Sequence, residues 1–235
     1  MLRPNTPPAM LYSIQLGTPK NYGFEEAVDP HGLPWTTGFF KTPVEGPVFA
    51  GTTNLVRDGQ ADLLNHGGID KPVLAYSADH YPKWRNELRI PDMPFGAFGE
   101  NLTIAGWSED SVCLGDILRI GTATFEVSQP RQPCWKLARR WRMHELAGLV
   151  VSNGRSGWYL RVLEQGWIAA KTPVELIERP NPAWSIARAN EIMHHRKMDL
   201  TVTLELADVP RLAESWVEEL RERAERLRAI GALKQ

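Results

Sequence analysis

The pattern of hydrophobic and polar positions divides the chain into two parts, and short apolar segments dominate the first part. These segments run for about four to eight residues between turn-forming Gly, Pro, Asn and Asp, as expected for β-strands. Many short strands at such spacing favour a barrel or a closed set of sheets. We predict strands at 10–17, 46–56, 71–77, 100–106, 111–121, 122–129 and 173–180.

Helical periodicity interrupts these strands. Apolar residues recur at steps of three and four residues in segments 78–88 and 135–150, which predicts two amphipathic helices. A shorter helical segment is predicted at 157–166, in GWYLRVLEQG. The first part of the chain is therefore expected to be mainly β with a few helices.

The composition shifts after Pro180, and the remaining segments favour helices. Segment 185–196 is one predicted helix, and segment 210–230 has the strongest helical pattern in the chain, with Glu and Arg at the spacing of helix ion pairs. Its apolar stripe consists of Leu212, Trp216, Leu220 and Leu227.

Segment 199–208, DLTVTLELAD, is ambiguous. Its apolar residues alternate with polar ones, which favours a strand, whereas its neighbours on both sides favour a helix. The pattern alone leaves both structures open.

Composition and charge narrow the class of protein. The chain has 235 residues and 43% hydrophobic residues, which suits one large domain or one domain with a small appendage. Its 27 basic residues are balanced by 28 acidic ones, so no overall field attracts nucleic acid or an anionic membrane. We find no apolar run long enough for a signal peptide or a membrane span. Two cysteines in this length indicate a reducing compartment, and we expect the cytoplasm.

Candidate chemistry concentrates in three segments, of which the first is LNHGGIDK. His66 precedes two glycines, which are followed closely by Asp70 and Lys71. Consecutive glycines let a backbone approach a ligand and expose its N–H groups, and a nearby lysine offers a point charge for phosphate. The alternative is a tight turn between two strands, and this segment taken alone favours the turn.

The second segment, FGENL, places Glu100 and Asn101 directly before a predicted strand. Their side chains have the donors and acceptors to bind the amide-rich edge of a heterocycle. They are equally suited to fasten a loop through bonds to its backbone. Both interpretations stay open at this point.

The third segment is QPRQPCWK at 129–136. Its prolines should end the preceding strand, and a helix is predicted to begin after them, which places Cys134 at a helix N-terminus. The helix dipole and nearby cations such as Arg131 and Lys136 stabilise a thiolate, which can act as a nucleophile or bind a soft metal. The other cysteine, Cys113, lies in a predicted strand interior, where we expect it to pack as a small hydrophobe.

Several common sites are not indicated. His194 and His195 have no Cys or His partners at zinc-ligand spacing. The chain also contains no Gly-rich phosphate loop, GxSxG elbow or dinucleotide fingerprint.

In their order and spacing, LNHGGIDKPVLAY, FGENLTIAGWSEDSVCLGDILRIG and VSQPRQPCWKL together resemble the MOSC domain, the molybdenum cofactor sulfurase C-terminal domain. The resemblance is strongest to the bacterial subgroup that protects cells against 6-N-hydroxylaminopurine. It covers nearly the whole chain and implies a MOSC-type, mostly antiparallel β-barrel at 1–180. A small three-helix C-terminal domain would follow at 181–235, which would make 199–208 a helix.

The resemblance also implies a cofactor and its ligands. Cys134 corresponds to the family's cysteine, which is a thiolate ligand of the molybdenum cofactor in relatives that reduce N-hydroxylated compounds. Because the pterin carries a phosphate, basic ligands are expected beside it. The candidates are Lys41, Lys71, Arg131 and Lys136 for the phosphate, and His66, Glu100 and Asn101 for the pterin or substrate side.

One turn of this chain differs from the family's pattern, and one long polar segment has no role that the resemblance explains. Members continue after the counterpart of 157–166 with a Gly-Asp turn, and here Lys171 and Thr172 take that place, so we expect a reshaped turn. The polar segment 18–38 contains three aromatic residues and is a candidate cap over the barrel mouth.

The implied activity is reduction of an N-hydroxylated small molecule, such as 6-N-hydroxylaminopurine, to the parent amine and water. His66 or Asp70 is the candidate for proton delivery. Since no flavin, haem or iron-sulfur motif is visible, electrons are expected from a separate reductase. Neither nucleic acid nor a membrane is an expected partner, and a homodimer is compatible with the sequence. Two alternatives remain, a persulfide sulfur carrier built on Cys134 and a non-catalytic binder of modified purines.

Overall fold

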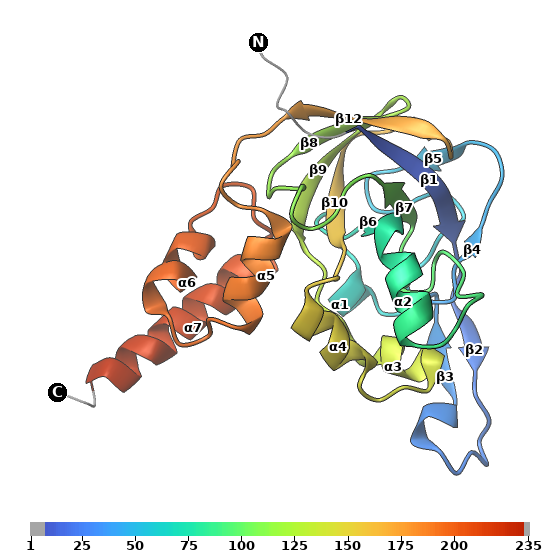
Figure 1. Ribbon diagram of the computed structural model, residues 1–235, viewed down its shortest axis with the longest axis horizontal. Helices are drawn as coiled ribbons and strands as arrows, with labels where there is room; N and C mark the ends of the chain where they lie inside the picture. Colours follow the sequence, from blue (N-terminus) through green and yellow to red (C-terminus); the bar gives the residue numbers. More distant parts are fainter. Residues whose placement is uncertain (1–7, 233–235) are drawn as a thin grey trace.

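The structure is a computed structural model that describes residues 8–232, although not the side chains of residues 65, 66 and 232. Its centre is a closed barrel of seven strands in the order β12-β8-β9-β10-β6-β7-β1, since β1 also pairs with β12 (Figure 1). Neighbouring strands are antiparallel, except that β6 and β7 run parallel. The bounds are β1 Ala9–Leu16, β6 Val73–Ser77, β7 Leu102–Ala105, β8 Ile117–Ile120, β9 Ala123–Pro130, β10 Trp158–Glu164 and β12 Thr172–Glu178.

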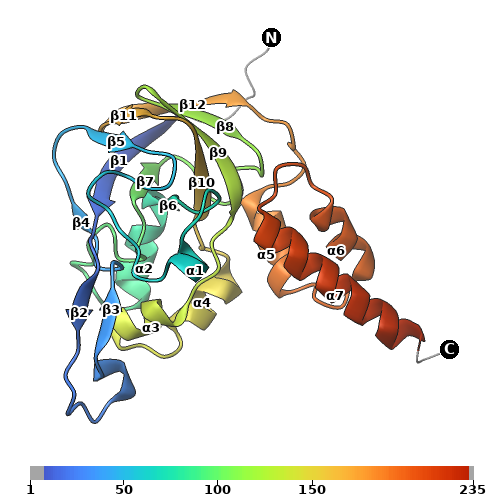
Figure 2. The same cartoon turned by 180° about the vertical axis from the view of Figure 1, so that it is seen from behind.

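Smaller strands extend the barrel. β4 (Thr42–Pro43) pairs antiparallel with the end of β1, and β5 (Val48–Ala50) pairs with β11 (Gly166–Ile168). β2 (Lys20–Tyr22) and β3 (Trp35–Thr37) form a hairpin that projects away from the barrel (Figure 2).

Short helices connect the strands at one end of the barrel. Two of them, α3 and α4, lie below the barrel in the view of Figure 1, and α3 lies beside the β2–β3 hairpin. The bounds are η1 Pro30–Gly32, α1 Leu63–His66, η2 Ala78–His80, α2 Tyr81–Glu87, α3 Trp135–Trp141 and α4 Leu146–Asn153.

Two apolar clusters fill this part of the chain. Inside the barrel, Phe125 of β9 packs with Trp158 and Leu160 of β10, and all three are fully buried. The second cluster joins Trp84 of α2 and Phe98 to the inner faces of α3 and α4. The short helices are therefore held by apolar burial, which is the main favourable contribution to folding.

Three further helices, α5 (Ile186–His194), α6 (Leu200–Ala207) and α7 (Glu214–Ala232), pack against one side of the barrel (Figure 1). Their buried residues Leu206 and Trp216 belong to the same apolar cluster as the barrel interior. The helical unit thus shares a core with the barrel. The division into 1–180 and 181–235 stays a prediction. No helix within residues 8–232 is long and apolar enough to cross a bilayer.

Most of the predicted elements are confirmed. All seven predicted strand segments contain a strand, although 46–56 contributes only the three residues of β5. The predicted helices 78–88, 185–196 and 210–230 correspond to η2 with α2, to α5 and to α7. Both expected ion pairs of α7 form, Arg223 with Glu219 at 3.7 Å and Arg226 with Glu222 at 3.6 Å.

The prediction of a helix at 157–166 is wrong, because this segment forms strand β10. Trp158, Leu160 and Val162 are buried, and the residues between them are more exposed. This is the period of two that a strand produces. The apolar residues of this segment are dense enough to satisfy a helical pattern as well, and pairing with β6 and β9 decides the outcome.

Segment 199–208 is a helix, as the family resemblance implied and against its alternation. Asp199 caps α6, since its Oδ1 accepts the N–H of Val202 at 3.2 Å. Thr203, Leu206 and Ala207 are the buried positions, at the spacing of a helix face. Capping and packing against α7 outweigh the local period of two.

Two predicted elements have different limits. Segment 135–150 divides into α3 and α4, because α3 ends at Arg142 in the left-handed conformation with φ 52°. In 111–121, only Ile117–Ile120 is a strand, and Gly115 with φ 76° turns the chain before it. Cys113 is buried as predicted but forms only an isolated bridge with Ser185, and burial raises the pKa of its thiol to about 11.

The shared core predicts the effect of truncating Trp216, whose side chain is 1% exposed at the contact between α7 and the barrel cluster. Trp216→Ala should lower the free energy of unfolding by about 3–5 kcal/mol, measured by urea denaturation, because it leaves a cavity. Ile230→Ala in the same helix removes a side chain from a residue that is 40% exposed and should cost less than about 1 kcal/mol. Equal losses for the two variants would contradict a shared core.

Candidate functional site

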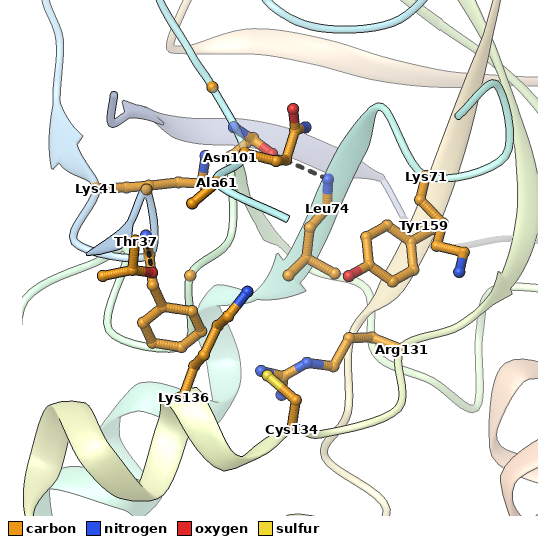
Figure 3. Close-up of a pocket in the computed structure, with 15 residues that line it drawn as sticks. Thr37, Lys41, Ala61, Lys71, Leu74, Asn101, Arg131, Cys134, Lys136 and Tyr159 are labelled. Carbon is orange, nitrogen blue, oxygen red and sulfur yellow. Dashed lines mark hydrogen bonds between the residues drawn. The ribbon is translucent and has the colours of Figure 1, made fainter. Parts of the chain in front are cut away.

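A pocket lies where the segment after β9 meets the start of α3, beside the base of the β2–β3 hairpin (Figure 3). It is lined by residues from distant parts of the sequence, including Thr37 and Gly38 from the hairpin side. The structure brings Cys134 together there with five of the residues predicted to bind the cofactor. These are Lys41, Lys71, Asn101, Arg131 and Lys136.

Cys134 lies at the helix N-terminus that the sequence predicted. It is the N-cap residue of α3 with extended backbone, and its carbonyl oxygen accepts the N–H of Leu137 at 3.1 Å. β9 ends at Pro130, as the prolines of this segment require. The thiol is half-buried and lines the pocket, so a ligand there can reach it.

Arg131 lies beside Cys134 in Figure 3 and is 2% exposed. Its Nη2 donates to the carbonyl oxygen of Phe98 at 3.3 Å. Its Nη1 is buried and has no hydrogen-bond partner among the described residues. A buried cation with an unused donor is costly unless an acceptor completes its bonding, so Arg131 is suited to bind an anionic ligand.

Lys136 brings a second positive charge to the same pocket. The residue is 7% exposed, and its Nζ points into the space between the pocket walls (Figure 3). Its ammonium lies 6.0 Å from the centroid of the Trp135 ring, and no carboxylate within the described part of the chain pairs with it. The Lys136 side chain is thus well placed to bind an anionic ligand.

Lys41 lines the pocket, but a carboxylate neutralises it. Its ammonium forms an ion pair with Asp58, whose side chain is fully buried. Burial lowers the pKa of Lys41, and the Asp58 charge opposes that shift. Asp58 also accepts the side-chain N–H of Asn101 at 2.8 Å and the backbone N–H of Gly17 at 2.8 Å. This carboxylate therefore organises one wall of the pocket.

Asn101 uses its side chain for the protein itself. Its Oδ1 accepts the N–H of Leu74 at 3.1 Å, and its Nδ2 donates to Asp58 and to the carbonyl oxygen of Gln15. Loop fastening, one of the two roles considered for this residue, accounts for these contacts. Asn101 shapes the pocket wall without a free polar atom evident for a ligand.

Glu100 is separated from the pocket. It is completely buried, and its carboxylate accepts bonds from the N–H groups of Gly96 at 2.6 Å and Phe98 at 3.1 Å and from the hydroxyl of Tyr81. Burial, followed by the Glu100 charge, raises the pKa of Tyr81 well above its ordinary value, so the phenol remains a donor. Glu100 fastens the 96–101 loop.

Asp70 is also directed elsewhere. Its Oδ1 accepts a bond from Nε of Arg161 at 2.6 Å, and its Oδ2 accepts the N–H of Glu214, the first residue of α7, at 3.3 Å. It does not line the pocket, which leaves it poorly placed for proton delivery. The neighbouring Gly68 turns the chain with φ 96°, in agreement with the turn interpretation. The side chain of His66 lies outside the described residues.

Tyr159 is a pocket residue that the sequence did not indicate. It comes from β10, and its hydroxyl points toward the space above Cys134 in Figure 3. Burial raises its pKa to about 12, while Arg131 lowers it and Cys134 raises it. The phenol is therefore protonated at neutral pH and can donate a hydrogen bond. Because 157–166 was predicted as a helix, the sequence analysis did not place Tyr159 at the pocket. In the strand that forms, alternate residues point to opposite faces.

The β2–β3 hairpin forms one side of the site, and α3 holds it. Arg139 donates from Nε to the carbonyl oxygen of His31 at 3.1 Å, and Arg140 donates from Nη1 to that of Phe39 at 3.1 Å. The ring of Phe39 approaches Gly99 so closely that a Cβ on this glycine would lie 2.5 Å from it. Segment 18–38 thus contributes its base to the pocket wall, and its role as a cap stays a prediction.

Two family models match this chain, one in its β-rich part and one in its helical part. The MOSC domain matches residues 62–175, and the YiiM-like 3-alpha helix domain matches residues 184–226. The first of these ranges includes Cys134 and all of the pocket's predicted ligands except Lys41.

Individual relatives extend the similarity over almost the whole chain. The chain is 40% identical to the uncharacterized protein YflK of Bacillus subtilis, over 92% of this chain and 94% of YflK. It is 32% identical to the protein YiiM of Escherichia coli, over 91% of this chain and 93% of YiiM. A protein of Gibberella moniliformis named "Reductase" is 37% identical over 74% of this chain, which corresponds to 32% of that longer protein.

Solved structures agree with this assignment. The crystal structure of YiiM from Geobacillus stearothermophilus has 37% sequence identity and a TM-score of 0.76, and the match covers 92% of this chain and 100% of that one. YiiM from Escherichia coli has 27% identity and a TM-score of 0.72, with 95% and 94% covered. The barrel with its cysteine pocket and the three helices after it therefore identify the chain as a member of the MOSC domain family, in the bacterial subgroup that carries a YiiM-like three-helix domain.

Proposed function

We propose that this protein is a molybdenum-cofactor-dependent reductase of N-hydroxylated compounds, with 6-N-hydroxylaminopurine and related base analogues as its substrate class. The observation that carries the proposal is the Cys134 thiol beside the buried Arg131, whose Nη1 has no partner among the described residues. Membership of the MOSC family and the fungal relative named "Reductase" support an oxidoreductase.

The donor set of the pocket fits such a cofactor. A thiolate is the soft ligand that a thiophilic transition metal prefers, and Cys134 is the cysteine that lines this pocket. Arg131 and Lys136 are buried cations placed around it, and the pterin's phosphate would supply the acceptor that Nη1 of Arg131 lacks. Lys71 adds a further basic side chain to the lining.

Each pocket group has a distinct task under this proposal. Cys134 would hold the metal, Arg131 and Lys136 the phosphate, and the Tyr159 hydroxyl would donate a hydrogen bond toward the reacting oxygen. When bound, the cofactor would supply the two electrons of the reduction. Together with two protons taken up from outside the cofactor, they convert an N-hydroxyl group to the amine and water. Asp58 and Glu100 keep the surrounding loops fixed through the bonds described above.

The electrons are proposed to come from a separate protein. The Gibberella relative named "Reductase" is about three times as long as the region it shares with this chain, since that region is 32% of its length. The proposal of a partner protein that delivers electrons rests on the sequence of this chain, in which no flavin, haem or iron-sulfur motif is visible.

Cys134→Ser should abolish retention of molybdenum and leave the fold intact, because the hydroxyl is a poor replacement for a thiolate ligand. The measurement is elemental analysis of the purified protein for molybdenum and phosphorus together. Cys113→Ser is the matched control, since that thiol is buried away from the pocket, and it should retain both elements.

Equal molybdenum in the Cys134→Ser variant and the parent would refute the metal-ligand role. A labile sulfane sulfur on Cys134, in protein without molybdenum, would support the persulfide carrier instead.

Arg131→Gln and Lys136→Gln should each weaken cofactor retention by about tenfold or more. The reason is that a hydrogen bond to a charged group contributes roughly 1.5–3 kcal/mol. Retention is measured as the molybdenum remaining after dialysis. Arg119→Gln, an exposed residue on β8, removes the same charge outside the pocket and should have no effect. Losses of equal size in all three variants would count against a specific phosphate contact.

Protein made in cells that cannot synthesise molybdopterin should not reduce 6-N-hydroxylaminopurine. Activity is followed by chromatographic separation of the substrate from the parent purine, with a chemical reductant as electron source. The control is the same strain with synthesis restored. Undiminished reduction without molybdopterin would overturn the proposal, and binding without turnover in both preparations would favour a non-catalytic purine binder.

A further inference from the structure

Two histidines meet outside the pocket, where the tip of the β2–β3 hairpin touches the connection between α3 and α4. Nε2 of His31 lies 2.8 Å from Nδ1 of His144, and their ring centroids are 4.0 Å apart. The residues are 113 positions apart in the sequence, so the fold creates this contact. A hydrogen bond between two imidazole nitrogens requires that one of them carries no proton, which leaves a lone pair directed at the partner ring.

A carboxylate completes the group. Asp29 lies with both histidines so that one ligand atom from each of the three residues falls within 4.8 Å of the other two. Its Oδ1 accepts the backbone N–H of His31 at 2.9 Å, which holds the carboxylate beside that histidine. All three residues are at least partly exposed, so an ion can enter from solvent.

We infer that Asp29, His31 and His144 form a binding site for a divalent transition-metal ion, with Zn²⁺ as the ion that these ligands favour. Two imidazoles and one carboxylate are a ligand set that zinc uses, at roughly 2.0–2.2 Å. At such bond lengths two ligand nitrogens on one ion are roughly 2.9–3.4 Å apart. The observed 2.8 Å lies just below this range, and the ligand atoms of the three residues lie within 4.8 Å of one another, so the side chains would turn and shift to converge on one ion. Water would fill the remaining coordination position.

Arg139, a cation that bonds to the backbone of His31, is compatible with this site. Arg139 donates from Nε to the backbone carbonyl oxygen of His31 and stacks over the rings of Trp35 and Trp135, at 4.9 and 5.5 Å from their centroids. Its bonds and its ring contacts thus direct it to the backbone and the indoles rather than to the imidazoles. At this exposed position its repulsion of an ion is screened by solvent.

The ion would fasten the hairpin to the α3–α4 connection. The base of that hairpin supplies Thr37 and Gly38 to the pocket, and α3 supplies Lys136. The bound metal would therefore brace a wall of the pocket from outside, independently of the chemistry at Cys134.

The test is a titration of metal-free protein with Zn²⁺ by isothermal calorimetry, with any affinity tag removed. Cys134→Ser serves as the parent, so that the pocket thiol cannot bind zinc. We expect one ion per chain. Adding His31→Ala or His144→Ala should weaken binding by at least about tenfold, a loss that even an outer-shell partner can cause. His195→Ala, which removes an exposed histidine at the end of α5, is the matched control and should bind as the parent does.

A second measurement is independent of the affinity. Zn²⁺ should raise the Tm of the parent and of the His195→Ala variant, because the ion binds the native state, and should leave the Tm of the His144→Ala variant unchanged. Unchanged Tm values without metal would show that the variants are folded. An absence of zinc binding to the parent, or binding to the His31→Ala and His144→Ala variants as strong as to the parent, would overturn the site.

Discussion

Closure of the barrel through β1 is the constraint on which the rest of the structure depends. β1 pairs with β12 along Ala9–Leu11 and with β7 along Met10–Ile14, and its last two residues pair with β4. Because Met10 and Leu11 pair with β12 and with β7, β1 uses both of its edges, so the first and last strands of the barrel meet and the strands between them are held in one register. This fixes the place where β9 ends at Pro130 and the chain leaves the barrel for α3, and with it the position of Cys134.

Around Cys134, buried carboxylates fix the loops through hydrogen bonds, and cations remain available to bind a ligand. Asp58 and Glu100 each accept several bonds from backbone and side-chain donors. Fully bonded polar groups in a low-dielectric interior specify one loop arrangement. Arg131 and Lys136, by contrast, have few contacts of their own within the described chain. The loops around the pocket are thus fixed by carboxylates, while the two cations are available to bind an anionic ligand.

The sequence revealed those parts of the site that depend on neighbouring residues. Cys134 could be identified because the prolines before it and the helix after it are local signals. Asp58 could not, since its partners Lys41 and Asn101 are 17 and 43 positions away. The segments 157–166 and 199–208 were misleading for a related reason. Their apolar residues satisfy more than one period, and pairing or packing with distant elements selects the structure. The family resemblance carried long-range information that periodicity lacked, and it was correct for α6.

Asp70 connects the helical unit to the segment that lines the pocket. Its carboxylate is tied to Arg161 on β10 and to the first N–H of α7, while the next residue in the chain, Lys71, lines the pocket. The first residue of α7 is therefore connected to the pocket lining through Asp70 and the adjacent Lys71. The C-terminal helices thus support the segment that carries Lys71, so the geometry of the pocket depends on the helical unit as well as on the barrel.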